Sequence, residues 1–88
     1  MKNLKLENSD DIVIRFKQES IVEVFEYEDT EMNEPVEERF VQNEEVEVTL
    51  FDDPNEHSLS VQFGDGSIAF IMQDAVEIVE INGESINQ

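Results

Sequence analysis

Apolar residues recur at every second position along much of this chain, and that spacing limits what the chain can fold into. Within residues 45–51, Val46, Val48 and Leu50 alternate with charged or hydroxyl-bearing side chains. Such alternation predicts a strand with one face in a core and the other in water. No segment of ten residues shows a helical period, so the sequence predicts an all-β protein.

Six segments have the alternation or the β-branched and aromatic composition of short strands. They cover residues 11–17, 20–28, 45–51, 59–63, 67–72 and 76–81. The links between them are expected to be a loop at 29–35, a polar turn at 52–58, an Asp-Gly hairpin turn at 64–67 and one helical turn at 72–75. Five or six short strands in an open sheet would leave bare edges and a wet apolar face, so we expect a small antiparallel barrel.

The order of segments from residue 38 to residue 81 resembles that of SH3-like barrels. It runs through "ERFVQNEEVEVTLFDD", "LSVQFGDGSIAFI", "MQDA" and "VEIVEI". The resemblance implies a strand, a tight hairpin and a single helical turn before the last strand. Asn43 stands where the family usually has glycine, and the ligand-gripping aromatic residues of signalling SH3 domains are not evident. Binding of proline-rich peptides is therefore not expected.

Length and composition indicate one soluble domain. The 88 residues predict a single unit over 1–88, with flexible ends at 1–10 and 82–88. The chain has no cysteine, which excludes disulfides, thiolate nucleophiles and cysteine zinc sites and favours a reducing cytoplasm, that of an infected host cell if a phage encodes it. The first ten residues lack the apolar stretch of a signal peptide, and the longest uncharged run, 66–73, is too short to span a membrane.

Negative charge dominates the chain. There are 23 acidic and five basic residues, a net charge of -18, and four of the five basic residues lie within the first 17 positions. Residues 24–40 carry seven carboxylates and one cation, Arg39. Such a surface repels nucleic acid and anionic lipid and attracts basic proteins, so we expect no direct binding of nucleic acid or membrane. A net charge of a few units suffices for the solubility of a small domain, although solubility or salt adaptation alone stays an alternative explanation.

Geometry offers a reason for the excess charge. Carboxylates at alternate positions of one strand, such as Glu45 and Glu47, project from one face about 6.6 to 6.8 Å apart. Nucleic-acid backbones present regular negative charge, which their binding proteins neutralise with Lys and Arg. The size, acidity and lack of cysteine resemble phage DNA mimics, which include anti-CRISPR proteins, anti-restriction proteins and uracil-DNA glycosylase inhibitors. The resemblance is of character only and transfers no residues.

The leading hypothesis is therefore an inhibitor that blocks the DNA- or RNA-binding surface of a basic protein, either a host defence nuclease or a CRISPR effector. Most of the seven aromatic residues are expected in the core. Tyr27 and Phe51 share faces with charged residues and are candidates for exposed interface anchors. The expected partner-binding residues are Glu26, Tyr27, Glu28, Asp29, Glu31, Glu34, Glu37, Glu38, Glu44, Glu45, Glu47, Phe51, Asp52, Asp53 and Glu56.

Other functions need other features. No carboxylate pair accompanies a nucleophile or a phosphate-binding loop, so we expect neither an enzyme nor a cofactor. Asp52, Asp53, Glu56 and His57 could bind a divalent ion weakly, but a polar turn is the simpler interpretation. An SH3-like adaptor or phage structural module that docks on a basic partner, as a monomer or a dimer, is the second hypothesis.

Overall fold

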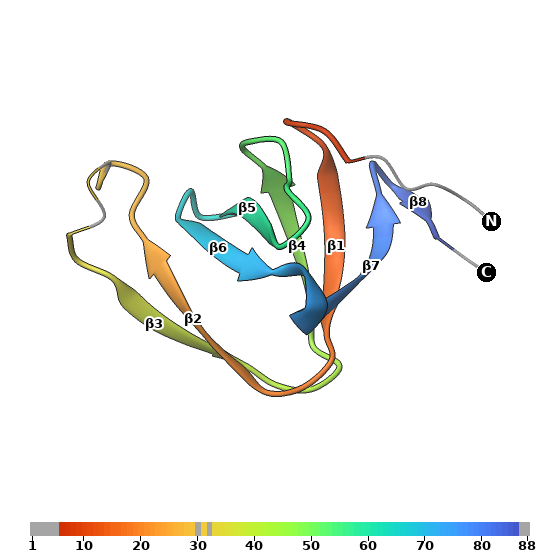
Figure 1. Ribbon diagram of the computed structural model, residues 1–88, viewed down its shortest axis with the longest axis horizontal. Helices are drawn as coiled ribbons and strands as arrows, with labels where there is room; N and C mark the ends of the chain where they lie inside the picture. The colour runs from red at the N-terminus through yellow and green to blue at the C-terminus, as the bar shows by residue number, and fades with distance from the viewer. Residues whose placement is uncertain (1–5, 30, 32, 87–88) are drawn as a thin grey trace.

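The computed structural model in Figure 1 describes residues 6–29, 31 and 33–86, and it confirms an all-β, antiparallel protein. The predicted count of five or six strands is wrong, because the sheet has eight. The strands are β1 (Asp11–Phe16), β2 (Ser20–Phe25), β3 (Val36–Phe40), β4 (Glu45–Leu50), β5 (Ser58–Phe63), β6 (Ile68–Met72), β7 (Val76–Ile81) and β8 (Glu84–Ser85). A single helical turn, η1 (Gln73–Ala75), precedes β7, close to its predicted place.

All eight strands belong to one sheet in the order β3-β2-β6-β5-β4-β1-β7-β8. The first strand thus lies between the fourth and the seventh, and every pairing is antiparallel. The sheet is open, with β3 and β8 as its edges, so closure into a barrel is not shown. The sheet curves, so that the inward faces of its strands pack together around one core. The apolar face is therefore buried although the sheet stays open, and burying it does not require a closed barrel.

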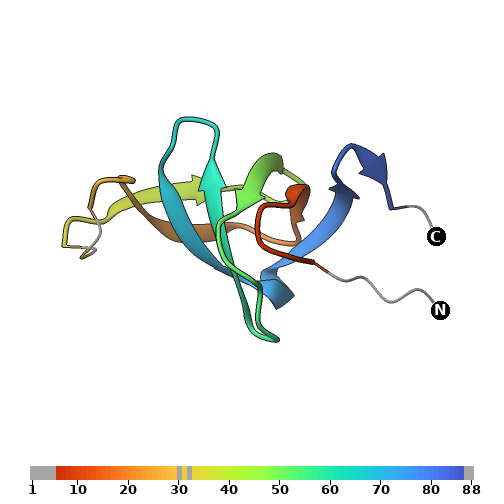
Figure 2. The same cartoon turned by 90° about the horizontal axis from the view of Figure 1, so that it is seen from above.

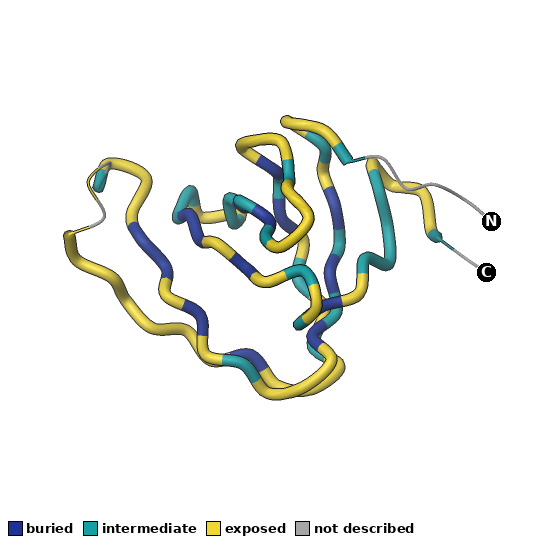
Figure 3. Tube along the Cα trace, viewed as in Figure 1, coloured by how far each residue is buried: buried dark blue, intermediate teal, exposed yellow. Residues whose placement is uncertain are grey.

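The two unpredicted strands are the two edges of the sheet. In β3 four of the five residues are exposed, and Figure 3 shows that the burial alternating along the inner strands is missing there. Charged residues on an edge strand discourage pairing with other chains. β8 follows Asn82 and Gly83, both of which have positive φ, as a two-residue hairpin turn of type I′ requires. The predicted strand at 20–28 ends earlier, at Phe25.

The core contains only apolar side chains. Every described strand except β8 contributes at least one buried residue, and no buried polar or charged side chain occurs among the described residues. Phe16 is fully buried and stacks on Phe40, with ring centroids 4.6 Å apart and planes 3° from parallel. Phe40 also stacks on Phe63 at 6.1 Å. These three rings attach the edge strand β3 to the rest of the core.

The β2–β3 hairpin forms an arm that diverges from the rest of the sheet. Its loop lies at one end of the molecule and β8 at the other, as the two views in Figures 1 and 2 show. The long dimension of the molecule is 41 Å, against 26 and 22 Å for the other two. β2 pairs with β6 only through Val24↔Ala69 and Phe25↔Ile68, so the two strands separate beyond these pairs.

The predicted ends and the loop at 29–35 fall partly outside the described residues, at positions 1–5, 30, 32 and 87–88. Within the described part, Leu6 packs against the core and the Ser9 backbone donates a 2.8 Å hydrogen bond to Leu50. Flexibility of the ends at 1–10 and 82–88 stays a prediction.

Candidate functional site

The outward side of three adjacent strands carries an array of carboxylates, which we call the acidic face. The acidic face comprises Asp11 of β1, Glu45 and Glu47 of β4, and Glu77 and Glu80 of β7. In β1 and β4 the inward residues are apolar and fill the core, so alternation directs the intervening side chains to solvent. In β7 a register shift opposite Val13 and Ile14 brings Glu77 and Glu80, three positions apart, to the same face. The carboxylates are therefore held on a paired, packed backbone.

Register places four of the five carboxylates of the acidic face in two rows across β1, and Asp11 lies opposite Thr49 outside these rows. In one row Val13 lies between Glu47 and Glu80. Neighbouring strands lie about 4.8 Å apart and strand residues rise about 3.3 Å each, so Glu47 and Glu80 emerge about 9.6 Å apart and successive rows about 6.7 Å apart. Because Val13 carries no charge, nothing within that row neutralises the two acids.

The second row contains the cation Arg15 between Glu45 and Glu77. Arg15 Nε lies 3.3 Å from an Oε2 oxygen of Glu45. Both side chains are more than a third exposed, so the pair adds little to stability. Its consequence is electrostatic, because Arg15 offsets part of the negative charge in one row and leaves the other row fully acidic.

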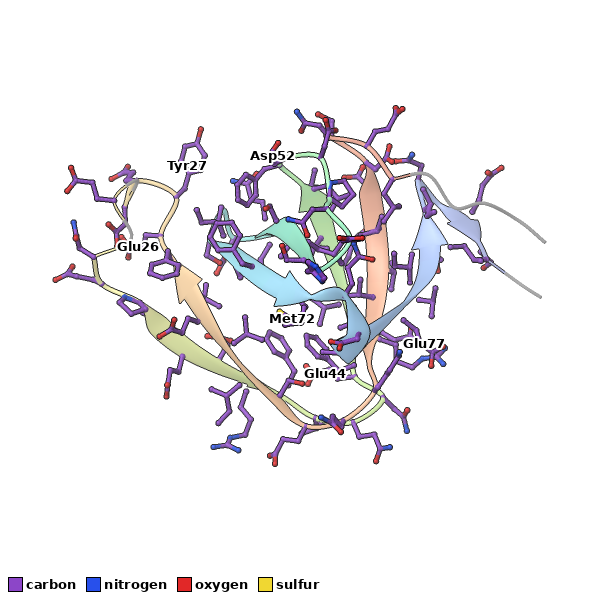
Figure 4. All side chains as sticks on the ribbon, in the orientation of Figure 1. Glu26, Tyr27, Glu44, Asp52, Met72 and Glu77 are labelled. Carbon is purple, nitrogen blue, oxygen red and sulfur yellow. The ribbon has the colours of Figure 1, made fainter. Side chains whose placement is uncertain are left out.

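Seven of the predicted partner-binding acids belong to the arm. They are Glu26, Glu28, Asp29, Glu31 and Glu34 in the loop, and Glu37 and Glu38 on β3. Asp29 organises this loop by accepting backbone hydrogen bonds from Asn33 at 3.0 Å and Glu34 at 2.9 Å. Figure 4 places Glu26 at the far end of the molecule from Glu77, so the arm and the acidic face are separate surfaces.

The remaining predicted acids lie in two turns. The Glu44 carboxylate accepts a 3.0 Å bond from the Val41 backbone, and Figure 4 shows Glu44 at the opposite end of the sheet from Asp52. Asp53 accepts a bond from the Asn8 backbone at 2.9 Å. The structure thus distributes the predicted set over the arm, the acidic face and two turns and does not gather it on one surface.

The turn at 52–57 was the candidate metal site. Its geometry is organised by Asn55, whose Oδ1 accepts backbone bonds from His57 at 2.7 Å and Ser58 at 2.8 Å. His57 lies 3.5 Å from Glu56, and both side chains are largely exposed. Within the described ranges, no group of three or more His, Asp or Glu side chains is placed to hold a metal ion.

The exposed aromatic residues divide between two places. Tyr27 is 67% exposed and lies with Glu26, Glu28 and Asp65 around a shallow hollow of about 520 Å³ between the arm and the β5–β6 turn. Carboxylates around an aromatic ring suit a Lys or Arg side chain. The sequence prediction did not include Asp65, because it lies in a different hairpin from the other residues of the hollow.

Phe51 is exposed as predicted, whereas Phe70, which was not among the aromatic residues expected at the surface, is 44% exposed. The two rings pack edge to face with centroids 6.0 Å apart. β6 is buried at Ala69 and Ile71 and exposed at Phe70 and Met72, so its apolar run covers both faces of the strand. The continuous hydrophobicity of this run concealed which of its residues point outward.

Two carboxyl groups have lowered pKa values. The pKa of Asp10 is lowered by a hydrogen bond from the Glu7 backbone and then by one from the Asn82 side chain. The pKa of Asp65 is lowered by the Ser67 hydroxyl and then by the Ser67 backbone, at 2.6 and 3.0 Å. In both cases hydrogen-bond donors stabilise the ionised carboxylate and so lower its pKa. Both carboxylates therefore stabilise their turns in the charged state.

No protein-family model, curated protein or solved structure matches the chain. Within the residues that the structure describes, no helix has the length and apolar character needed to cross a bilayer. Function therefore has to be inferred from the chain's own surfaces.

Proposed function

We propose that this protein is an acidic inhibitor that occupies the nucleic-acid-binding surface of a basic protein, in the manner of a DNA mimic. The observation that supports the proposal is the row in which Glu47 and Glu80 flank Val13 on three paired strands. An array held by a backbone ladder keeps its charges in place when a partner binds, so little ordering entropy opposes binding. The target class is a host defence nuclease or a CRISPR effector in the cytoplasm.

The energetic basis of this function is the interaction that nucleic acid itself makes. Lys and Arg in a nucleic-acid groove interact with phosphates largely through charge and the release of counterions. Carboxylates in rows about 6.7 Å apart can neutralise the same cations, and a net charge of -18 accelerates the encounter. Affinity should accordingly fall steeply as salt rises. The arm acids and Tyr27 would add contacts at one end of the groove.

The proposal requires neither a cofactor nor a reaction. Stoichiometric blocking depends only on shape, charge and a slow dissociation rate. Tyr27 and Phe51 supply exposed rings beside carboxylates, and such rings, when desolvated by a partner, often dominate the affinity of an interface.

A second candidate function is an SH3-like adaptor that docks on one basic protein. In its favour, Asn43 has a φ of 70°, a conformation that glycine and asparagine adopt readily, at the position where the resembling family usually has glycine. The order of a hairpin, the turn η1 and β7 also fits that family. An adaptor would bind its partner without displacing nucleic acid.

The test is a panel of purified restriction enzymes, other nucleases and CRISPR effectors, assayed for DNA cleavage with and without the protein. We expect at least one to be inhibited at a one-to-one ratio, with weaker inhibition at higher salt. The variant Glu47→Lys/Glu80→Lys should weaken that inhibition by about a hundredfold, because two attractive contacts become repulsive.

The matched control is Asp74→Lys/Glu84→Lys, which makes the same charge change outside the acidic face and the arm. It should weaken inhibition by less than about tenfold, through long-range attraction alone. Equal inhibition by the wild type and the Glu47→Lys/Glu80→Lys variant would exclude mimicry by this face. A stable partner whose DNA binding is unaffected would favour the adaptor.

A further inference from the structure

β2 and β6 separate part of the way along their length and leave two strand edges facing each other. Beyond the pairs Val24↔Ala69 and Phe25↔Ile68, residues 20–23 of β2 pair only with β3 on their other side. Residues 70–72 of β6 likewise pair only with β5. Unpaired strand edges present backbone donors and acceptors that an added strand can use.

A groove of about 440 Å³ occupies the space between these two edges. Buried Phe16, Val22 and Ile71 line it, and the exposed side chains on its rim are Ile21, Phe70 and Met72. The rim side chains are 55%, 44% and 56% exposed, which is unusual for large apolar residues. Met72 lies near the middle of the molecule in Figure 4, between the arm and the β4–β1–β7 strands.

This part of the surface is almost uncharged in a strongly acidic chain. Residues 58–64 and 66–73, which include β5 and β6, contain no charged residue, and Asp65 separates the two stretches. The groove has a single charged lining residue, Glu23. An apolar groove surrounded by an acidic surface has the character of the centre of an interface, where charge is depleted, bounded by a polar rim.

Charge decides which occupant fits this groove. A second copy of the chain would bring another net charge of -18 to the site and would place two copies of Glu23 near each other. An extended segment from a basic protein would instead reduce the repulsion. We propose that the β2–β6 groove binds an extended segment of the partner in which apolar residues alternate with Lys or Arg.

The geometry specifies the mode of binding. The part of β2 that has no partner on the groove side is four residues long, 20–23, which corresponds to about 13 Å of extended chain. A segment of that length would pair its backbone with β2 or β6, place alternate apolar side chains over Ile71, and direct its cations outward toward Glu23. The choice of a basic partner rests on the proposed function, whereas the groove and the open edges do not.

The probe is a fluorescein-labelled synthetic peptide of alternating Lys and Val, nine residues long, measured by fluorescence anisotropy against the full chain. Two control peptides accompany it. One replaces every Val with Ser at the same charge, and the other keeps the side chains but carries N-methyl groups on alternate backbone nitrogens, which prevents strand pairing. We expect both controls to bind at least about tenfold more weakly than the alternating peptide.

The variant Ile21→Ser/Met72→Ser removes two exposed apolar side chains from the rim, and Val41→Ser is its control, because Val41 is 53% exposed and does not line the groove. Ile21 and Met72 lie on the outward face with Glu23, where the aliphatic stems of the peptide's Lys side chains would cover them. The double variant should therefore weaken binding of the alternating peptide about tenfold, and Val41→Ser should leave it unchanged. Equal binding to the double variant and the wild type, equal binding of the N-methylated peptide, or no binding of the alternating peptide would each overturn the inference.

A charge-reversed acidic face separates this inference from the proposed function. Because Glu47 and Glu80 are not among the groove residues, Glu47→Lys/Glu80→Lys should retain the preference for alternating over Ser-substituted peptide. If this variant no longer inhibits the nuclease but still prefers the alternating peptide, inhibition depends on the acidic face and peptide binding depends on the groove. Absence of inhibition throughout the panel, with the preference present, refutes the proposed function alone.

Discussion

Replacing Glu47 with glutamine should make the protein more stable, because it removes one charge from an array of like charges. Glu45 lies about 6.7 Å away along β4 and Glu80 about 9.6 Å away across β1, which in water amounts to repulsions of about 0.6 and 0.4 kcal/mol. The diagonal neighbours Arg15 and Asp11 are at similar distances and have opposite signs, so their contributions nearly cancel. The expected gain is about 0.8 kcal/mol at 0.01 M salt and about 0.1 kcal/mol at 1 M salt.

The assay is urea denaturation of the wild type and Glu47→Gln at these two salt concentrations, with the free energy of unfolding obtained by linear extrapolation. The control is Glu19→Gln, which is the same chemical change at a residue whose carboxylate lies 3.0 Å from Arg39. That variant should lose up to about 0.5 kcal/mol, since it removes an attraction. A gain in stability for Glu47→Gln and a loss for Glu19→Gln would show that the effect depends on the neighbouring charges and not on the change from Glu to Gln itself.

Two results would refute this reasoning. One is a lower free energy of unfolding for Glu47→Gln at low salt, which would mean that Glu47 makes a stabilising contact. The other is an increase of equal size at both salt concentrations, since a Coulombic repulsion between exposed groups has to weaken when salt is added.

Three further predictions concern the core and the turns. Phe40→Ala should cost roughly 3 to 5 kcal/mol in urea denaturation, because it removes the ring that stacks on Phe16; a loss below about 1 kcal/mol would mean that the arm is not attached through this ring. Asn82→Gly keeps the positive φ but removes the side-chain bond to Asp10, so the pKa of Asp10 should rise toward its ordinary value in a carboxyl-carbon NMR titration, and no rise would contradict that bond. Ser67→Ala should likewise raise the pKa of Asp65. A carboxyl whose folded-state pKa is lowered stabilises the fold above its unfolded-state pKa and loses that contribution as the pH falls through the folded-state pKa, so Ser67→Ala should lessen the acid sensitivity that arises from this turn.

The inner strands could be predicted from the sequence, because a strand that is buried on one face has apolar residues at every second position. Val48 and Leu50 are buried and Glu45 and Glu47 exposed, as the alternation predicts. β3 could not be predicted in this way, because an edge strand pairs on one side only and is exposed on both faces over most of its length. β8 contains only two residues, and its signal was the Asn82-Gly83 turn rather than any hydrophobic pattern.

The candidate site could be predicted only along single strands. The spacing of Glu45 and Glu47 indicates one outward face, but their neighbours Glu77 and Glu80 belong to a strand about 30 residues later in the chain. They join the acidic face because β1 lies between β4 and β7, and that order is set by long-range pairing and core packing. Phe70 was missed for a related reason, since an uninterrupted apolar run does not reveal which of its residues reach solvent.

The position of β1 also has a consequence for biosynthesis. One of its two neighbours, β7, spans Val76–Ile81, so the second edge of β1 remains open until about 65 further residues have been synthesised and β7 has left the ribosome. Pairings between such distant segments close large loops and are slow to form. A nascent chain would therefore expose the Ile12 and Ile14 face for seconds during translation, and the surrounding carboxylates would keep neighbouring nascent chains from associating through it.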